Sequence, residues 1–501
     1  MNDEPSASSE NEVNPVPDTI ENSADATPQY PTPETSKVTE PEPPKKKSKK
    51  WLLISLASVL LGAGLVIALL LFGPWKNAIV SDNDNSDKTT IVYAVHWLQE
   101  PQVQGIYKDG VLQSKGLKQY LDEYTALHPD IEFAIQQISY DEYANKLKVL
   151  NDSGAAPDIY QIYSQWGVDY VKSSMLDVPP ADIIKDVQEN YISTSGVEID
   201  GTIWGIPTEI NNFALLYNKK LFIEAGLVDA SGNVQVPQTW AELRTAAQTL
   251  TKRDSSGAIS QYGFAFTRDN DWQVVDPFLS LMFSNDGQYL SDDLSKSLVN
   301  SSEGIAALDA EVALFNDGST DANGNFFDFQ EGKVGMVISP PWTKSGFATS
   351  FGEEFESTVG VAPMPYMKKP STLQYSWFMG VMNQSQNKQE SWDFLKWFSS
   401  DIQETTGTTR YGDLLANNIG AIPARKVDFE KHNDVLGDFF TSVFVDQMSS
   451  SVAEPNVLSS SAIKTGLMQE IQAAWDGTKT SGQALDAASA AIDAILEQNK
   501  Q

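Results

Sequence analysis

Apolar and polar residues alternate in two different rhythms along most of the chain. Short runs such as TTIVYAVHW (89–97) and APDIYQIYS (156–164) have the length and the β-branched and aromatic content of strands. Residues 116–130 and 140–154 instead repeat apolar residues about every 3.6 positions, as amphipathic helices do, and residues 131–139 alternate as a strand. Strands that alternate with helices predict parallel sheets covered by helices, with ligands bound at the carboxyl ends of the strands.

The middle of the chain adds local turn and cap signals to this pattern. Asp200-Gly201 is typical of a hairpin turn, and Asn218 is placed to cap a helix. Thr239, followed three residues later by Glu242, predicts a capping box at the start of the next helix. These signals predict a hairpin and two capped helices.

The stretch VGMVISPPW (334–342) predicts a strand that stops at two prolines. Proline fixes its own φ and disfavours helical backbone in the residue before it, so Trp342 is expected on a stiff corner. A rigidly held aromatic ring loses little freedom when a ligand binds to it. We therefore predict that Trp342 is a ligand platform, and the alternative is a structural Trp packed under the loop.

The N-terminal residues have a different composition. Residues 1–44 are rich in Pro, Glu, Ser and Thr, which is typical of a disordered segment, and KKKSKK (45–50) follows. Residues 51–75 carry no charge and are longer than the roughly 20 residues that cross a bilayer, whereas the apolar core of a cleaved signal peptide has about 7–15. Lysines before the span place the N-terminus in the cytoplasm. We predict a cytoplasmic tail (1–50), an uncleaved transmembrane anchor (51–75), a tether (76–88) and an extracellular binding domain.

The composition excludes several classes of function. A formal net charge of −32 argues against nucleic acid as a partner, because that affinity begins with neutralisation of phosphates by Lys and Arg. The chain has no cysteine and three histidines, and it contains no Gly-x-Ser-x-Gly, His-Glu-x-x-His or phosphate-loop motif. Composition leaves a glycosidase pair of carboxylates open, although no two carboxylates stand out. We therefore predict no enzymatic activity and no cofactor.

One stretch has the oxygen spacing of a calcium loop. DGSTDANGNFFD (317–328) places oxygen-bearing side chains at positions 1, 3, 5, 7 and 12. Ala322 stands where such a loop needs glycine, and the twelfth residue is Asp in place of Glu. We predict a turn insertion here and no metal site, with calcium as the alternative.

Several segments, in this order and spacing, resemble the extracellular solute-binding proteins of ABC importers, in particular the large sugar-binding family typified by maltodextrin-binding protein. The resemblance extends from about residue 91 to residue 496. Family members are usually held to the membrane by a lipidated cysteine, which this chain lacks, so its mode of attachment departs from the family pattern. The segments are DGTIWGIPTEINNFALLYNKKLFIEAGL, VPQTWAELRTAAQTL, YGFAF, FFDFQEGKVGMVISPPW, VGVAPMPY, SWFMGVM, ESWDFLKWFSS and GAIPARK.

The resemblance implies an α/β, two-lobe periplasmic-binding-protein-like fold of class II, with a hinge that the chain crosses three times. The crossings are expected near residues 211–215, 375–379 and 419–425, and the ligand is expected in the cleft between the lobes. Lobe 1 would comprise residues 89–213 and 377–422, and lobe 2 residues 214–376 and 423–501.

Five of the twelve tryptophans follow or begin predicted strands. Flat aromatic rings bind the apolar faces of sugars, while carboxylates and amides bind the hydroxyls. The other tryptophans border the predicted membrane span (Trp51, Trp75) or are predicted to pack in the core (Trp204, Trp240, Trp392, Trp397, Trp475). We predict that the ligand contacts Trp97, Trp166, Trp272, Trp342 and Trp377.

Polar candidates lie on the same loops as these tryptophans. Glu209 and Asn211 match positions where the resemblance implies an acidic or amide group on the sugar. Gln99 and Glu100 follow Trp97, and Asp269 and Asn270 are on the Trp272 loop. The remaining candidates, Ser164 and Gln165, precede Trp166, whereas Arg410 is expected on a helix surface.

Together these observations predict a monomeric, membrane-anchored, extracellular solute-binding protein. It would capture a carbohydrate, in particular an oligosaccharide, and deliver it to the permease subunits of an ABC transporter. The alternative is a surface lectin or sensor with the same fold and no transport role. A peptide or osmolyte binder would have fewer aromatic residues at the strand ends.

Overall fold

The computed structural model describes residues 88–96 and 100–500, which belong to one compact unit. The predicted tail, anchor and most of the tether lie outside the described residues, as do Trp97 and Gln99. Among the helices that the structure does describe, none is both long and apolar enough to cross a membrane.

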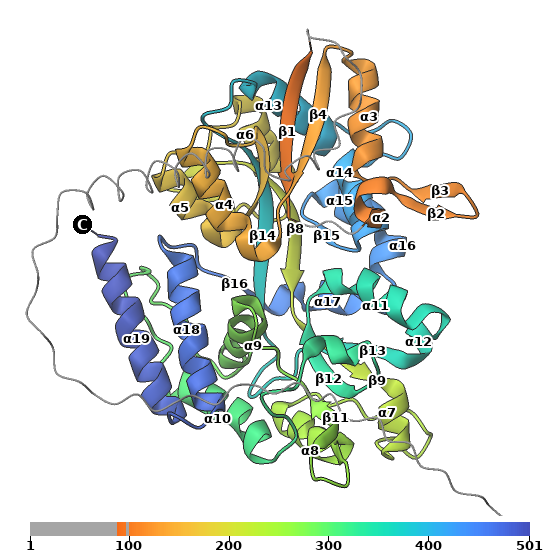
Figure 1. The fold of residues 1–501 in the computed structure, drawn as a ribbon, viewed down its shortest axis with the longest axis vertical. Coiled ribbons are helices and arrows are strands. Elements are labelled where there is room, and N and C mark those ends of the chain that lie inside the picture. Colours follow the sequence, from red (N-terminus) through yellow and green to blue (C-terminus); the bar gives the residue numbers. More distant parts are fainter. Residues whose placement is uncertain (1–87, 97–99, 501) are drawn as a thin grey trace, which may run out of the picture. The chain divides into compact units, whose positions relative to one another are not determined.

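The first of two large sheets has seven strands and occupies the upper half of Figure 1. Its order is β15-β8-β14-β5-β1-β4, and β16 pairs with the start of β14. Its central strands are almost completely buried, which explains their continuous apolar runs. The strands are β1 (Thr89–Val95), β4 (Ile131–Gln137), β5 (Ile159–Tyr163), β8 (Ile206–Asn212), β14 (Thr372–Val381), β15 (Ile422–Pro423) and β16 (Ser451–Ala453).

The second sheet has five strands in the order β10-β11-β12-β9-β13 and lies in the lower half of Figure 1. The two sheets and the helices on them form a mixed helix and sheet fold with two lobes. The strands are β9 (Ala214–Asn218), β10 (Lys252–Arg253), β11 (Ile259–Phe264), β12 (Val334–Ser339) and β13 (Val359–Pro363). Two small hairpins pair β2 (Ile106–Lys108) with β3 (Val111–Ser114) and β6 (Glu198–Ile199) with β7 (Thr202–Ile203).

Strand direction departs from the prediction of parallel sheets. Only β1 with β4 and β5, β11 with β12, and β14 with β16 run parallel. The long strand β14 is antiparallel to β5 and β8, and β9 is antiparallel to β12 and β13. The prediction is confirmed for β1, β4 and β5, the strands from which it was made, and is wrong for β8 and β9. These two strands are joined without a helix between them, so no crossover connection makes them parallel to their neighbours.

The chain passes between the sheets where strands of different sheets follow each other. Phe213, fully buried, is the single residue between β8 and β9, and residues 364–371 connect β13 with β14. After β15 the chain continues through short helices to α17 (Thr441–Gln447), which packs on β13 and β8. Strand β14 belongs to the first sheet from Thr372 onward, whereas the second segment of lobe 1 was predicted to begin at residue 377. The limits of the lobes stay a prediction.

Helices cover the sheets, and four of them form a group beside β14. In this group α18 packs on α9, α10 and α19. The helices of the first half are α2 (Glu100–Gln104), α3 (Leu117–Leu127), α4 (Tyr140–Asp152), α5 (Gly167–Lys172), α6 (Ala181–Asn190), α7 (Lys219–Glu224), α8 (Trp240–Leu250) and α9 (Asp271–Ser284). The later ones are α10 (Ser302–Asn316), α11 (Lys344–Phe351), α12 (Phe355–Thr358), α13 (Lys388–Ser399), α14 (Arg410–Leu414), α15 (Lys426–Lys431), α16 (Asn433–Leu436), α17 (Thr441–Gln447), α18 (Ser460–Trp475) and α19 (Ser481–Gln498).

The local signals in the sequence are confirmed. Asp200 and Gly201 have φ of 51° and 73°, as the β6–β7 hairpin requires. The Asn218 side chain accepts a hydrogen bond from the Leu221 N–H at the start of α7. Thr239 and Glu242 form the predicted capping box of α8.

Candidate functional site

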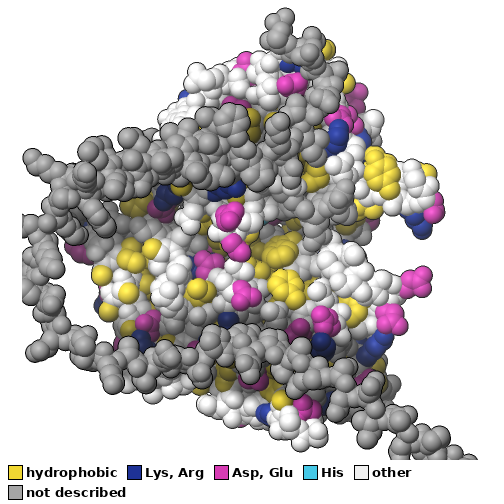
Figure 2. All heavy atoms as spheres, in the orientation of Figure 1, with side chains coloured by type: hydrophobic (Ala, Val, Ile, Leu, Met, Phe, Trp, Pro, Cys, Tyr) yellow, Lys and Arg dark blue, Asp and Glu magenta, His cyan; other side chains and the backbone are white. Residues whose placement is uncertain are grey.

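A cavity of about 330 Å³ lies where elements of the two sheets face each other. The first sheet contributes the ends of β1 and β5 and the strands β8 and β14, and the second contributes the start of α9 and the turn after β12. Figure 2 shows hydrophobic side chains gathered in this part of the face, with acidic side chains beside them. The described residues that line the cavity are His96, Gln102, Tyr140, Asp141, Tyr163, Glu209, Asn270, Trp272, Trp342, Tyr375, Trp377, Ile419 and Ala421.

Aromatic rings from the first sheet form one wall of the cavity. Trp377, on β14, stacks on His96 with ring centroids 3.8 Å apart and an interplanar angle of 7°. Tyr163, the last residue of β5, lies 5.4 Å from Trp377 and 5.6 Å from Tyr375 between ring centroids. Each ring packs against its neighbours, which limits the freedom that it can lose when a ligand binds.

Two tryptophans line the opposite wall. Trp272 and Trp342 meet edge to face with centroids 5.4 Å apart. Pro341 begins a short 3₁₀ turn that carries Trp342, and the Trp342 indole N–H donates to the Tyr375 hydroxyl across 2.9 Å. Trp342 is 37% exposed, whereas Trp377 is 6% exposed. Trp342 is therefore the ring more open to a ligand.

Glu209 lies on β8 and is the buried carboxyl group of the cavity. It is 8% exposed, and burial raises its pKa to about 7. Its Oε2 atom has no hydrogen-bond partner among the described residues. A buried acceptor without a partner is costly, and a ligand donor would remove that cost. Glu209 thus borders the cavity with a carboxyl group, one oxygen of which is buried without a partner.

His96, directly after β1, is neutral at physiological pH. Burial lowers its pKa to about 3, and its Nδ1 atom has no hydrogen-bond partner among the described residues. The His96 ring therefore adds an aromatic side chain and no charge to the cavity lining.

The predicted site residues separate into three groups. Trp272, Trp342, Trp377 and Glu209 line the cavity, as does Asn270, which was named on the Trp272 loop. A second group, Ser164, Gln165, Trp166 and Asn211, is buried close by without lining it. Trp97 and Gln99 lie outside the described residues, and of Glu100 the structure gives only the backbone, at the start of α2.

Two members of the second group, Trp166 and Gln165, make packing or hydrogen-bond contacts with buried neighbours in this structure. Trp166 contacts the rings of Tyr163 and Trp377 at centroid distances of 5.5 Å each. Gln165 donates from Nε2 to the Glu454 carboxylate over 2.7 Å. Asn211 is 1% exposed, and neither its Oδ1 nor its Nδ2 atom has a partner among the described residues.

Sequence reasoning did not name several residues of the cavity. Tyr140 and Tyr163 had a usable signal, because each stands at a junction between a strand and a helix, as the predicted tryptophans do. Ile419 and Ala421 lie in the segment 419–425 where a hinge crossing was expected, but no local pattern marks either residue as a lining residue. The others that were missed are His96, Gln102, Asp141 and Tyr375.

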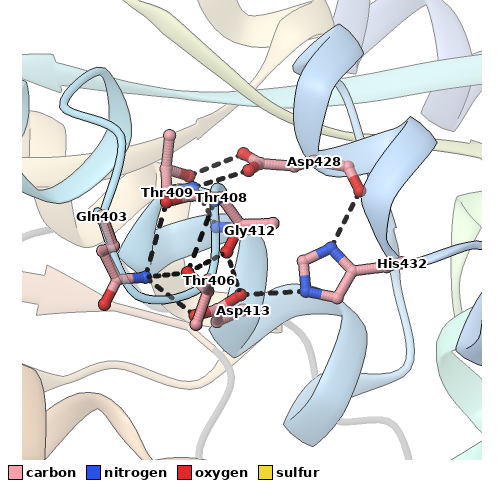
Figure 3. A network of polar contacts seen from close by, with 8 residues as sticks. All are labelled: Gln403, Thr406, Thr408, Thr409, Gly412, Asp413, Asp428 and His432. Atoms are coloured by element: carbon pink, nitrogen blue, oxygen red, sulfur yellow. Dashed lines mark hydrogen bonds and ion pairs between the residues drawn. The ribbon is translucent and has the colours of Figure 1, made fainter.

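A polar network fixes the segment that carries Ile419 and Ala421 (Figure 3). Asp428 accepts from the backbone N–H and the hydroxyl of Thr409, at 2.7 and 2.6 Å, at the start of α14. His432 contacts the Asp413 carboxylate at 2.9 Å and the Asp428 carbonyl at 2.8 Å. The network ties α14 to α15 and so holds both ends of the connection between them.

A second group of charges lies buried beside the cavity; we call Tyr163, Asp276, Glu454 and Lys464 the ionic cluster. The Lys464 ammonium lies 2.5 Å from the Asp276 carboxylate and 3.0 Å from that of Glu454. The Tyr163 hydroxyl donates to Glu454 over 2.5 Å. Since Tyr163 also lines the cavity, the ionic cluster fixes the position of one of its rings.

The stretch 317–328 folds as a turn region. Asp317 pairs with Arg244, and Asp321 accepts from the Tyr262 hydroxyl and the Asn323 N–H. Within residues 88–96 and 100–500, no group of three or more His, Asp or Glu side chains could hold a metal ion.

The fold and the cavity between its sheets define a two-lobed solute-binding protein. Residues 110–405 match the family model of the bacterial extracellular solute-binding proteins, and the chain belongs to that family. A maltotriose-binding protein of Pyrococcus abyssi is 23% identical over 314 residues, which are 60% of this chain and 62% of that protein. A maltooligosaccharide ABC transporter solute-binding lipoprotein of Streptococcus pneumoniae is 23% identical over 387 residues, covering 70% and 78% of the two chains.

Solved structures show the same fold. An ABC substrate-binding protein from Listeria monocytogenes, in complex with cycloalternan, superposes with a TM-score of 0.68. The match covers 82% of this chain and all of that one at 19% identity. The predicted two-lobe periplasmic-binding-protein-like fold is confirmed.

Proposed function

We propose that the protein captures a carbohydrate in the cavity between its lobes and delivers it to the permease of an ABC importer. One observation carries the proposal. Trp272 and Trp342 from one side, and Trp377 and Glu209 from the other, face the same cavity. Aromatic faces match the C–H faces of sugar rings, and the carboxylate accepts from hydroxyls.

The relatives agree with this assignment. The two named above bind maltotriose and maltooligosaccharides by their descriptions. We therefore propose an oligosaccharide as the ligand, held through at least Trp272, Trp342, Trp377 and Glu209. The other predicted contacts, Trp97, Gln99, Glu100, Ser164, Gln165, Trp166 and Asn211, belong to the same proposal.

Titration of the full-length chain in detergent micelles with a panel of mono- and oligosaccharides tests the proposal. Intrinsic tryptophan fluorescence reports on Trp272, Trp342 and Trp377, and calorimetry gives the affinity. We expect saturable binding of at least one oligosaccharide with a change in fluorescence. If no sugar in the panel binds, the proposed function is wrong.

Delivery to a permease is the second part of the proposal. We propose that the protein acts as a monomer, held at the outer surface of the membrane by residues 51–75, an uncharged span that follows six residues containing five lysines. A surface lectin or sensor would bind the same sugar without uptake. Deletion of the gene should therefore abolish uptake of the radiolabelled ligand, and unchanged uptake would favour the lectin or sensor.

A further inference from the structure

The charges around the cavity are of one sign. Its described lining includes the carboxylates of Glu209 and Asp141 and no Lys or Arg, and His96 is neutral. Asp141 is exposed at the start of α4, so it faces solvent at the edge of the cavity.

The nearest cations do not offset this charge. Lys464, behind Tyr163, is held by the carboxyl groups of Asp276 and Glu454, so its positive charge is paired within the ionic cluster. Lys344, two residues after Trp342, pairs with Asp438 and also contacts the Thr441 hydroxyl. A ligand in the cavity therefore meets two acidic side chains and no Lys or Arg among the described residues that line it, and charge interactions beside protein are stronger than in bulk water.

Two further features suit a positive group. The Glu209 Oε2 atom is buried without a partner and belongs to a residue whose side chain lines the cavity. The rings of Trp272, Trp342 and Trp377 attract cations through their π faces, as aromatic cages do. A neutral hydroxyl could donate to Glu209, but a protonated amine would form the stronger, charge-assisted hydrogen bond.

We propose that the ligand is a basic sugar, one that carries a protonated amine seated between Glu209 and the tryptophan faces, and that sugars with carboxylate, sulfate or phosphate groups are excluded. This inference rests on the proposed function, because it specifies the class of carbohydrate. It does not follow from the fold, since a cavity of the same shape lined by Lys or Arg would select the opposite charge.

Three disaccharides of similar size test the inference by calorimetry on the full-length chain at pH 7. They are a glucosamine disaccharide, its fully N-acetylated form, and a disaccharide that contains a uronic acid. The glucosamine disaccharide should bind at least about tenfold more tightly than the acetylated form, and the uronic acid form should bind more weakly than either.

Variants assign the effect to Glu209. Glu209→Gln should reduce the preference for the amine to about twofold or less. Glu311→Gln is the matched control, because Glu311 is also a buried carboxyl with a raised pKa but lies between α10 and α18 away from the cavity lining. It should leave the preference unchanged. If Glu209→Gln fails to fold, Asp141→Asn at the edge of the cavity provides the test and should lower the preference about two- to threefold.

The outcomes separate this inference from the proposed function. Three results would overturn the inference of a basic sugar and leave carbohydrate capture standing. They are equal binding of the amine and acetamido forms, tighter binding of the uronic acid form, and a preference for the amine that survives in both cavity variants. Failure of all three disaccharides and of the oligosaccharide panel overturns the proposed function as well.

Discussion

Replacing Trp342 with alanine should weaken ligand binding much more than it weakens the fold. The ring is 37% exposed and, in the described structure, contacts Trp272 at one edge and Tyr375 through the indole N–H. Loss of an aromatic ligand contact costs on the order of 2 kcal/mol, or about thirtyfold in affinity. The lost hydrogen bond to Tyr375 contributes only about 1 kcal/mol to stability, so the melting temperature should fall by a few degrees at most.

Trp377 provides the matched comparison. It is 6% exposed and packs on His96, Tyr163 and Trp166, so Trp377→Ala should cost about 3–5 kcal/mol of unfolding free energy in addition to affinity. Trp342→Phe keeps a ring and loses only the N–H donor, so it should retain most of the affinity that Trp342→Ala loses.

Two measurements on the full-length variants test these effects. Calorimetric titration with an oligosaccharide that binds the wild-type protein gives the affinity, and a thermal melt gives the stability. The competing account treats Trp342 as a structural residue packed under its loop. That account predicts wild-type affinity together with a melting temperature lowered as far as in Trp377→Ala. Such a result would refute the assignment of Trp342 as a ligand platform.

Four further predictions concern stability, closure and attachment. Burial raises the pKa of Glu311 from 4.5 to about 8, so its contribution to stability is full below pH 4.5 and is lost as the pH rises to 8. The wild-type protein should therefore lose on the order of 3–5 kcal/mol of unfolding free energy over this range. Glu311→Gln should not show this loss when urea unfolding is measured at pH 8. Lys464→Met leaves two buried carboxylates without their cation and should cost about 3–5 kcal/mol in the same assay. Because the chain has no cysteine, spin labels can be attached at Leu127→Cys and Ile223→Cys, two exposed positions. The distance between the labels should change when the lobes close on a sugar, and an unchanged distance at saturating sugar would mean a rigid protein. N-terminal sequencing of the membrane-extracted protein should find an intact span 51–75, and a chain starting near residue 75 would show cleavage.

Local features of the fold were predictable because the residues that determine them are neighbours in sequence. The Asp200-Gly201 turn needs only two residues that tolerate positive φ, and the capping box of α8 needs only Thr239 and Glu242. The corner at Trp342 was predictable for the same reason. Strand direction was not, because it depends on which strand lies beside which. The passage through Phe213 from one sheet to the other lies within the crossing expected near residues 211–215, but that expectation came from the family resemblance and not from a local signal.

The site was predictable to the extent that aromatic residues at strand ends mark it. Trp272, Trp342 and Trp377 share one cavity, as expected, but Trp166 stands in the same kind of position and is buried behind Tyr163. Whether a ring at a strand end lines the cavity or supports a neighbour depends on side chains packed from other elements. That choice is a tertiary property, so the sequence pattern identifies the set of rings better than any single member.

Lys464 shows how far the cavity depends on residues that no pattern could identify. A lysine on an amphipathic helix is normally expected at the surface, yet this one is fully buried because Asp276 of α9 and Glu454 after β16 converge on it. Its partner Glu454 also receives the Tyr163 hydroxyl and the Gln165 amide, so two residues at the end of β5 are oriented by charges far along the chain. Such a buried group of charges contributes little net stability compared with apolar packing, but it allows only one arrangement of its members. The ionic cluster therefore determines the position of the Tyr163 ring in the cavity wall. The shape of that wall depends on α9 and α18, which carry Asp276 and Lys464, as much as on β5, which carries the ring.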